Sequence, residues 1–254
     1  MPVSVIIPAF NAAPFIEAAL RSLLLERDSI QLDIIVIDDG STDQTREIVE
    51  GVSRDFPEIR LLQNPRKGIA AARNTGLENL PEKCRFVTFL DSDDMSYPNR
   101  IAGQRAALID DPKIDVLYGR LKMFMVQDAT LLAPALGSPT KVIRGPYLQA
   151  SMYRREVIEK VGRFDESFRQ GCDTDFILRV IDQDHRLILG DEIAAYYRRH
   201  AGNVTLNTEE RQREFMAASL RWAVRRRRRG AGAIPPVYAK LFLENETTDW
   251  EFEK

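Results

Sequence analysis

The sequence predicts an α/β fold: a mixed, mainly parallel sheet flanked by helices, followed by a C-terminal helical appendage. Short β-branched runs alternate with helical patterns through the first hundred residues, and two of these runs end directly in acidic residues. Such alternation indicates right-handed crossovers and strands whose carboxyl ends share one edge. The 254 residues, 44% hydrophobic and 29% charged, suffice for one large domain with its own core.

The first half supplies most of the predicted sheet. We expect strands over 3–7, 33–37, 59–62 and 86–90. Apolar side chains recur at helical spacing after Pro14, and Thr42 or Asp43 is expected to cap a second helix that runs to about Arg54. An alanine-rich third helix is expected over 68–80.

The second half alternates less regularly. Helices are expected over 99–109, 155–161 and 173–181, an apolar stretch over 116–126, and strands near 186–189 and 194–198. There is no internal repeat and no low-complexity linker. We therefore expect one mixed domain over residues 1–205 and a helical extension over 206–254.

Composition narrows the classes of function. The net charge of −2 argues against nucleic-acid binding, which usually needs a large basic excess. Cys84 and Cys172 are far apart, which argues against a zinc site or a disulfide framework and suits a reducing, cytoplasmic compartment. No window approaches the roughly 20 apolar residues of a membrane-spanning helix, so membrane contact would be peripheral.

Acidic residues follow two of the expected strands. Asp38 and Asp39 come after the second strand, and the run Asp91-Ser92-Asp93-Asp94 comes after the fourth. Ligands of open parallel sheets bind beyond the carboxyl ends of the strands, so both groups should face one crevice. Two carboxylates at alternate positions suit Mg²⁺ or Mn²⁺ with a diphosphate. The alternative is a polar turn whose aspartates cap a helix.

Basic and small residues lie between these two acidic groups. Arg66, Lys67 and Arg73 lie on or beside the expected third helix, and Gly68 allows a ligand to approach the backbone. The guanidinium of Arg73 could balance the acids or bind a phosphate. Its alternative is an ordinary arginine on a helix surface.

Seven segments together resemble the family 2 glycosyltransferases in residue order and spacing. They are VSVIIPAFNAAPFIEAALRSLL, VIDDGSTDQT, GIAAARNTGL, FLDSDD, VGRFDESF, GCDTDFILRV and YRRHAGNVT, and they cover roughly residues 1–205. The resemblance implies the GT-A fold, inverting chemistry and a nucleotide-diphosphate sugar donor, with a UDP-sugar expected. It also implies a nucleotide-binding half over 1–98 and an acceptor-binding half over 99–205.

The resemblance implies roles for the nucleotide side. Pro8, Ala9 and Asn11 would line the nucleoside pocket. Asp39, with Asp38 beside it, would contact the base or the ribose.

It also implies roles on the metal side. Arg73 would orient the nucleotide, and Asp91, Ser92 and Asp93 form the DxD signature for Mn²⁺ or Mg²⁺. Asp93 is expected to bind the metal directly, and His200 falls where relatives carry a metal-completing histidine. The alternative for His200 is a structural histidine.

The resemblance aligns Asp173 with the family's general base, which would deprotonate the acceptor hydroxyl. Asp175 aligns with the acid two residues later, and Cys172 stands where the family usually has glutamate. The alternative is that Asp173 only caps the helix that it opens.

The C-terminal region carries eight arginines and three glutamates between residues 209 and 229. This pattern predicts either a peripheral membrane contact through 211–229 or, as the favoured interpretation, a helix packed on the domain with a solvated arginine end. The acidic residues 244–254 could neutralise the arginines within the chain or in a homodimer.

These expectations converge on transfer of a single sugar to a glycan or lipid-linked acceptor in polysaccharide or glycolipid assembly. Two alternatives stay open. One is a relative that binds nucleotide-sugar without turnover, and the other is a haloacid-dehalogenase-like phosphatase, whose DxD strand normally opens the fold.

Overall fold

A computed structural model describes residues 2–126, 128–183, 185–203, 208–230 and 251–252. The strands are β1 Val3–Ala9, β2 Leu32–Asp38, β3 Ile59–Gln63, β4 Phe86–Phe89, β5 Met95–Ser96, β6 Val116–Met125, β7 Pro139–Ile143, β8 Ser151–Arg154, β9 Leu187–Arg199 and β10 Glu251–Phe252. The helices are α1 Ile16–Leu24, α2 Thr45–Asp55, α3 Ile69–Glu78, α4 Arg100–Asp110, α5 Arg155–Val161, α6 Cys172–Ile181 and α7 Thr208–Arg228, with a 3₁₀ turn η1 at Leu148–Ala150.

The described strands form one sheet in the order β10-β7-β6-β8-β4-β1-β2-β3, and β9 pairs with β5 and β6. Strands β3, β2, β1 and β4 are parallel neighbours, whereas β8, β6 and β7 add antiparallel pairs. The parallel register sets Ala9 opposite Asp38. The ends of β1, β2 and β4 therefore share one edge, as the sequence predicts.

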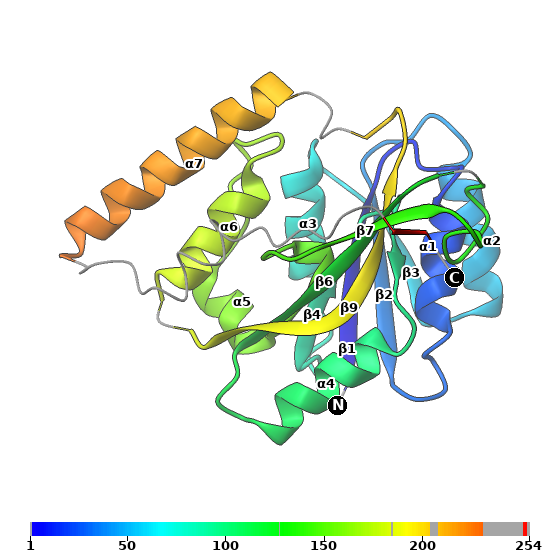
Figure 1. The fold of residues 1–254 in the computed structure, drawn as a ribbon, viewed down its shortest axis with the longest axis horizontal. Coiled ribbons are helices and arrows are strands. Elements are labelled where there is room, and N and C mark those ends of the chain that lie inside the picture. The colour runs from blue at the N-terminus through cyan, green and yellow to red at the C-terminus, as the bar shows by residue number, and fades with distance from the viewer. Residues whose placement is uncertain (1, 127, 184, 204–207, 231–250, 253–254) are drawn as a thin grey trace.

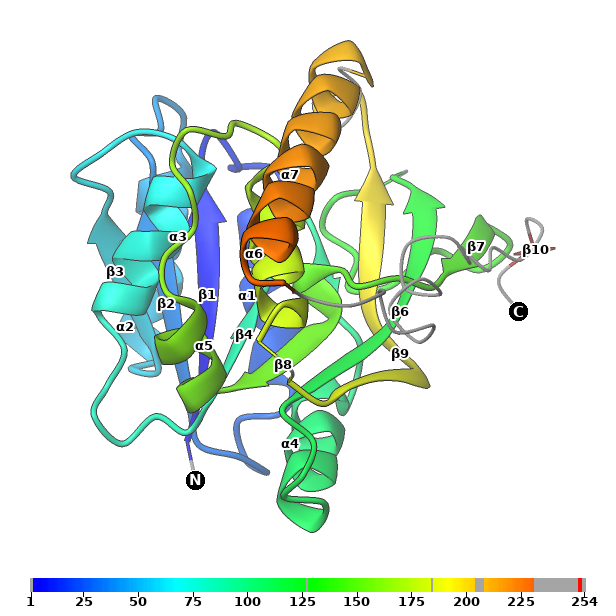
Figure 2. The same cartoon turned by 90° about the vertical axis from the view of Figure 1, so that its left-hand side faces the viewer.

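Helices cover both faces of the sheet (Figures 1 and 2). Because side chains alternate along a strand, Ile6 faces one core with α3, α5 and α6, while Val5 and Ile7 face a second core with α1, α2 and α4. The helices form a layer on each side of the sheet and bury both faces of β1, β2 and β4. This burial explains why the sequences of these strands are continuously apolar.

The structure adds the strands β5, β7, β8 and β10, which are not predicted from the sequence, and it differs from the predicted elements at β9 and at the start of α2. The strands expected near 186–189 and 194–198 are one long strand, β9, whose register against β6 shifts between Tyr118 and Leu121. The expected cap of α2 is also wrong in position. The helix begins at Thr45, its N-cap position is Gln44, and Asp43 instead accepts hydrogen bonds from the N–H groups of Ala13 and Thr45.

In the C-terminal extension the structure describes helix α7, which packs along α6 at the outer edge of the molecule (Figure 1), and the two-residue strand β10, which pairs with β7. None of the described helices is long and apolar enough to cross a membrane. Most of the acidic run 244–254 and the expected boundary at 205/206 lie outside the described residues.

Candidate active site

Helix α3 links the two acidic groups. At its start, the N–H of Gly68 donates to both oxygens of Asp39, at 2.9 and 3.1 Å. Five residues further on, Arg73 reaches Asp91 at 3.1 Å. Five residues of helix rise only about 7–8 Å, so the ends of β2 and β4 face the same short stretch of α3.

The carboxylates after β2 are held in fixed positions. Asp39 also accepts a 2.6 Å hydrogen bond from the amide of Asn64, and Lys67 donates to the Asp39 carbonyl at 2.9 Å. Asp38 is buried and accepts hydrogen bonds from the N–H of Ser41 and from Arg46. Burial opposes ionisation, but these donors hold the pKa of Asp38 below its ordinary value, so it stays a carboxylate.

Asn11 ties the end of β1 to the loop after β2. Its backbone has a positive φ of 48°. Its amide oxygen accepts from the N–H of Thr42 at 2.8 Å, and its own N–H donates to Ser41 at 3.0 Å. With Pro8 and Ala9 as the last residues of β1, these contacts place the expected nucleoside-pocket residues together at the sheet edge.

Arg73 lies at the centre of the site, which excludes the interpretation as a surface arginine. Its side chain is only 1% exposed, and it pairs with both Asp91 and Asp173. Burial would lower its pKa, but Asp173, Cys172 and Asp91 raise it, so the guanidinium stays charged. One buried cation thus joins a residue after β4 to a residue that opens α6.

Replacing Arg73 by glutamine should lower the free energy of unfolding by about 2–3 kcal/mol. The value lies below that of a fully buried pair because Asp91 and Asp173 remain partly exposed, at 28% and 34%. Urea denaturation at pH 7 measures it. The control is Arg21→Gln, which breaks an exposed pair with Glu17 and should cost at most about 0.5 kcal/mol. Equal losses in the two variants would contradict the central role of Arg73.

The pKa of the Asp91 carboxyl lies above its ordinary value. Burial raises its pKa to about 6; Arg73 opposes the rise, and Asp93 and Asp173 add to it. Three carboxylates around one arginine leave an excess of negative charge. A bound cation would relieve that excess.

Asp93 and His200 lie together, as the sequence predicts. The Nε2 atom of His200 is 3.1 Å from Oδ2 of Asp93, and the imidazole ring stacks on Phe15 with centroids 4.3 Å apart. The amide of Asn203 donates to the same Asp93 oxygen at 3.2 Å. These contacts fix the Asp93 carboxylate from one side.

The carboxylates of Asp91, Asp93 and Asp173 share one feature of their hydrogen bonding. Asp91, Asp93 and Asp173 each use one oxygen for the contacts above, and no described residue donates a hydrogen bond to the other oxygen. Ser92 lies half-buried in the same turn. Within the described ranges, no three Asp, Glu, His or Cys side chains already form a metal-binding group. The free oxygens of Asp91 and Asp93, with His200 beside Asp93, are ligands that suit a divalent cation that takes its remaining ligands from phosphate and water.

Asp173 does not cap α6. The helix has Gly171 at its N-cap position without a side-chain cap, whereas Asp173 turns toward Arg73. Cys172 is buried, and its thiol donates to Oδ1 of Asp173 at 3.2 Å. Burial and then the charge of Asp173 raise the pKa of this thiol well above its ordinary value, so it remains an S–H donor. The cysteine therefore orients Asp173 without adding charge.

Glu214 of α7 holds the backbone just before Asp173. Its carboxylate accepts hydrogen bonds from the N–H groups of Arg169, Gln170 and Gly171, at 2.6–3.1 Å. A Cβ at Gly171 would meet the Glu214 Cβ at 2.9 Å, so only glycine allows this approach. Burial opposes ionisation, but the three N–H donors hold the pKa of Glu214 below its ordinary value.

Glu214→Gln should reduce stability by about 1–2 kcal/mol at pH 7, since hydrogen bonds to a charged acceptor are lost. A lowered folded-state pKa means that this stabilisation is present above the ordinary pKa of 4.5 and is lost as the pH falls through the folded-state value. Denaturant melts from pH 7 to pH 3 should show the two proteins converging at low pH. The exposed Glu209→Gln is the control, and a gap that is constant with pH would contradict the mechanism.

The structure thus brings together Arg73, Asp91, Asp93, Asp173 and His200. Asp38, Asp39 and Asn11 lie at the same sheet edge, beyond the start of α3. Sequence reasoning missed three further contributors, which are Asn64, Asn203 and Glu214. Asn203 lies three residues after His200 within a motif segment and could have been found by that spacing.

Comparison with known proteins agrees with this geometry. The profile of Glycosyl transferase family 2 matches residues 4–162. The chain belongs to this family, and its fold is the GT-A fold.

Relatives cover most of the chain at modest identity. The Uncharacterized glycosyltransferase EpsJ of Bacillus subtilis is 28% identical over 221 residues, which are 80% of this chain and 62% of EpsJ. The UDP-Glc:alpha-D-GlcNAc-diphosphoundecaprenol beta-1,3-glucosyltransferase WfaP of Escherichia coli is 28% identical over 81% of this chain and 80% of its own. The chain thus spans less than two thirds of EpsJ.

A solved structure has the same fold. The mannosyltransferase PcManGT from Pyrobaculum calidifontis, in complex with GDP-Man and Mn²⁺, superposes with a TM-score of 0.67 at 20% identity. The match covers 96% of this chain and 70% of that chain.

Proposed function

We propose that this chain is an inverting glycosyltransferase that moves one sugar from a nucleotide-diphosphate donor, a UDP-sugar, to an acceptor hydroxyl. The observation that carries the proposal is the free oxygen on each of Asp91, Asp93 and Asp173 around the buried Arg73. Residues 1–98 would hold the nucleotide and residues 99–205 the acceptor. The UDP-Glc donor named for WfaP supports a UDP-sugar, and the GDP-Man and Mn²⁺ of the PcManGT complex support a nucleotide-diphosphate donor and a divalent cation.

In the proposed mechanism, Asp39 binds the base or ribose, and Pro8, Ala9 and Asn11 wall the nucleoside. Mn²⁺ or Mg²⁺ on Asp93, with Asp91 and His200 beside it, would stabilise the charge of the leaving diphosphate. Arg73 adds a fixed positive charge to the same site. The free Oδ2 of Asp173 takes the proton of the acceptor hydroxyl, while Arg73 and Cys172 hold Oδ1.

Isothermal titration with UDP and GDP, with and without Mn²⁺, tests the donor side. We expect UDP to bind, and to bind more tightly with the cation. Absence of metal-dependent binding for every nucleotide would remove the proposal. Binding without transfer to any acceptor would instead favour a relative that holds nucleotide-sugar without turnover.

One relative supports the acceptor side of the proposal. WfaP is named for a diphosphoundecaprenol acceptor, so a glycan or lipid-linked acceptor in cell-envelope glycan synthesis is part of the proposal. Peripheral contact with the membrane through 211–229 would give access to such an acceptor. The cytoplasmic location and the homodimer remain predictions.

A further inference from the structure

The two sides of α7 differ in chemistry. The inner side packs on α6, where Ala218 is buried and Arg225 pairs with Asp175 at 3.0 Å. The outer side carries three large apolar side chains spaced four residues apart, which places them on one face, namely Met216 (64% exposed), Leu220 (67%) and Val224 (41%). Contiguous exposed apolar side chains on one helix face indicate a surface that another body covers.

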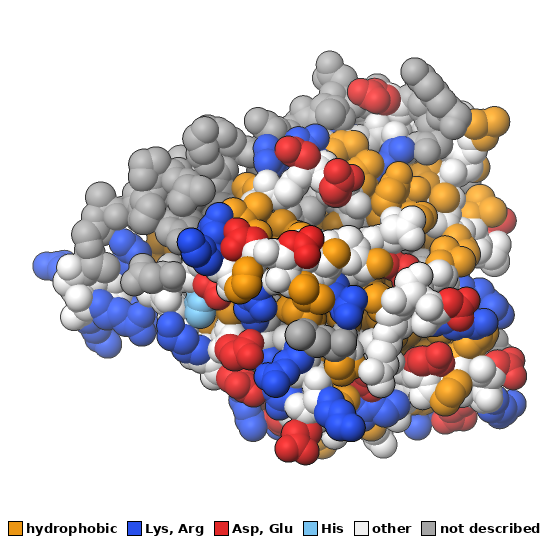
Figure 3. Space-filling model, turned by 90° about the horizontal axis from the view of Figure 1, so that it is seen from below, with side chains coloured by type: hydrophobic (Ala, Val, Ile, Leu, Met, Phe, Trp, Pro, Cys, Tyr) orange, Lys and Arg blue, Asp and Glu red, His pale blue; other side chains and the backbone are white. Residues whose placement is uncertain are grey.

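The arginines of the run 225–229 lie on both sides of α7. Arg225 and Arg226 contact Asp175 and Asp182 of the α6 segment, as the packed-helix interpretation expects. Arg227 and Arg228 are exposed, and no carboxylate of the described chain pairs with them. Lys and Arg side chains gather at the end of the molecule where α7 ends (Figure 3).

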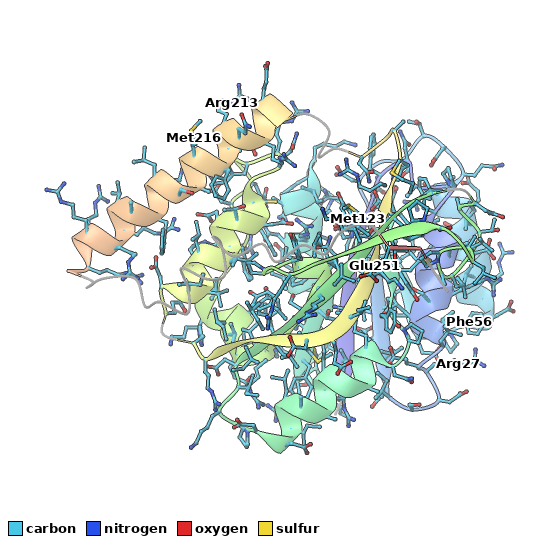
Figure 4. The ribbon with its side chains drawn as sticks, viewed as in Figure 1. Arg27, Phe56, Met123, Arg213, Met216 and Glu251 are labelled. Carbon is cyan, nitrogen blue, oxygen red and sulfur yellow. The ribbon has the colours of Figure 1, made fainter. Side chains whose placement is uncertain are left out.

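Positive charge also borders the apolar residues at the other end of the helix. Arg213 is 74% exposed, and its ion pair within the described residues is a 3.7 Å contact with Glu210. Figure 4 shows Arg213 and Met216 on α7 at the outer edge of the molecule. Of the acids in α7, Glu210 and Glu214 are engaged with the loop before α6, which leaves Glu209 as the exposed one in the described helix.

We propose that the outer face of α7, formed by Arg213, Met216, Leu220, Val224, Arg227 and Arg228, docks on an anionic lipid surface. Apolar residues in the middle would enter the acyl boundary, and the arginines at both ends would meet lipid phosphates. The arginines of this face complement the negative charge of lipid phosphates. We therefore expect the face to bind a lipid surface rich in phosphate and not a neutral apolar partner.

The outer face of α7 lies next to the start of α6. A hollow of about 380 Å³ lies between α6 and α7, and Gly171, Thr174, Arg211, Phe215 and Met216 line it. Gly171 and Thr174 flank the segment that carries Asp173. Because Met216 lines this hollow, the lipid-facing side of α7 begins near the backbone that carries Asp173; resting on the proposed function, a membrane-borne acceptor would arrive there.

Co-sedimentation with vesicles tests the proposal without donor or acceptor, so its outcome is separate from that of the transfer reaction. We expect binding to phosphatidylglycerol-containing vesicles, weakening with salt, and little binding to pure phosphatidylcholine. The double variant Arg227→Gln/Arg228→Gln should bind about 25-fold more weakly, from about five-fold for each arginine. Met216→Glu/Leu220→Glu should abolish binding.

The matched control changes an exposed leucine and an exposed arginine elsewhere, Leu25→Gln and Arg54→Gln, and should bind like the parent protein. Circular dichroism and thermal melting of every variant check that the domain is folded. Equal binding of the α7 variants and the control would overturn the proposal. So would α7 variants that dissociate a dimer in sedimentation velocity while vesicle binding persists, since the face would then bind a second copy.

Discussion

Asp173→Asn should lower kcat by about 10³-fold, because an amide cannot take the proton of the acceptor hydroxyl. The change keeps the size of the side chain, and the amide oxygen can still accept from Arg73 and from the thiol of Cys172. Affinity for the nucleotide should therefore stay close to that of the parent protein. Steady-state transfer rates with saturating donor measure the first effect, and titration with UDP and Mn²⁺ measures the second.

The exposed Asp55→Asn, at the end of α2, is the matched control and should retain full activity. A rate for Asp173→Asn within about ten-fold of the parent would contradict the role of Asp173, since general bases contribute at least 10²-fold. An equal loss of nucleotide affinity would show instead that Asp173 acts only through Arg73.

Asp93→Asn should remove the dependence of UDP binding on the cation and lower kcat/KM by about 10³-fold. Metal coordination to a leaving diphosphate is worth several kcal/mol, and about 4 kcal/mol corresponds to this factor. His200 and Asn203 would lose their charged partner, yet the turn should remain folded because Asp94 anchors it. Titration of UDP at increasing Mn²⁺ gives the affinity, and initial rates give kcat/KM.

Asp94→Asn is the control within the same segment. Asp94 is buried, accepts from the N–H of Arg198 at 2.9 Å and lies 3.4 Å from the Gln149 amide. Burial, followed by Asp93 and Asp91, raises its pKa well above the ordinary value. Asparagine at this position can keep the hydrogen bond from the N–H of Arg198 through its amide oxygen. We expect Asp94→Asn to keep its metal response. A similar loss in both variants would mean that any change in this turn destroys the site.

Local patterns in the sequence were sufficient to predict the acidic edge of the sheet. The runs before Asp38 and Asp91 are apolar on both faces because helices cover both sides, and this continuity marks a buried parallel strand. The position of the acids directly after these runs then placed them at one edge. Asp93 and His200 were paired through the resemblance, and the structure has them in contact.

Long-range contacts could not be predicted in this way. Arg73 meets Asp173 across a separation of 100 residues, and Glu214 meets the loop before α6 across about 43 to 45. The spacing of residues along the sequence cannot predict such contacts, because they depend on how α3, α6 and α7 pack. The same reason explains β9, whose two apolar stretches join into one strand because β6 pairs with both of them across the register shift between Tyr118 and Leu121.

The central claim is that the ends of β2 and β4 meet at α3 around a cation and a diphosphate. A crystal structure with UDP and Mn²⁺, phased on the anomalous signal of manganese, tests it most directly. We expect a manganese peak about 2 Å from the Asp93 carboxylate. The metal should also contact the diphosphate, and the uridine should lie beside Asp39. A nucleotide bound away from Asp39, or manganese without contact to Asp93, would contradict it.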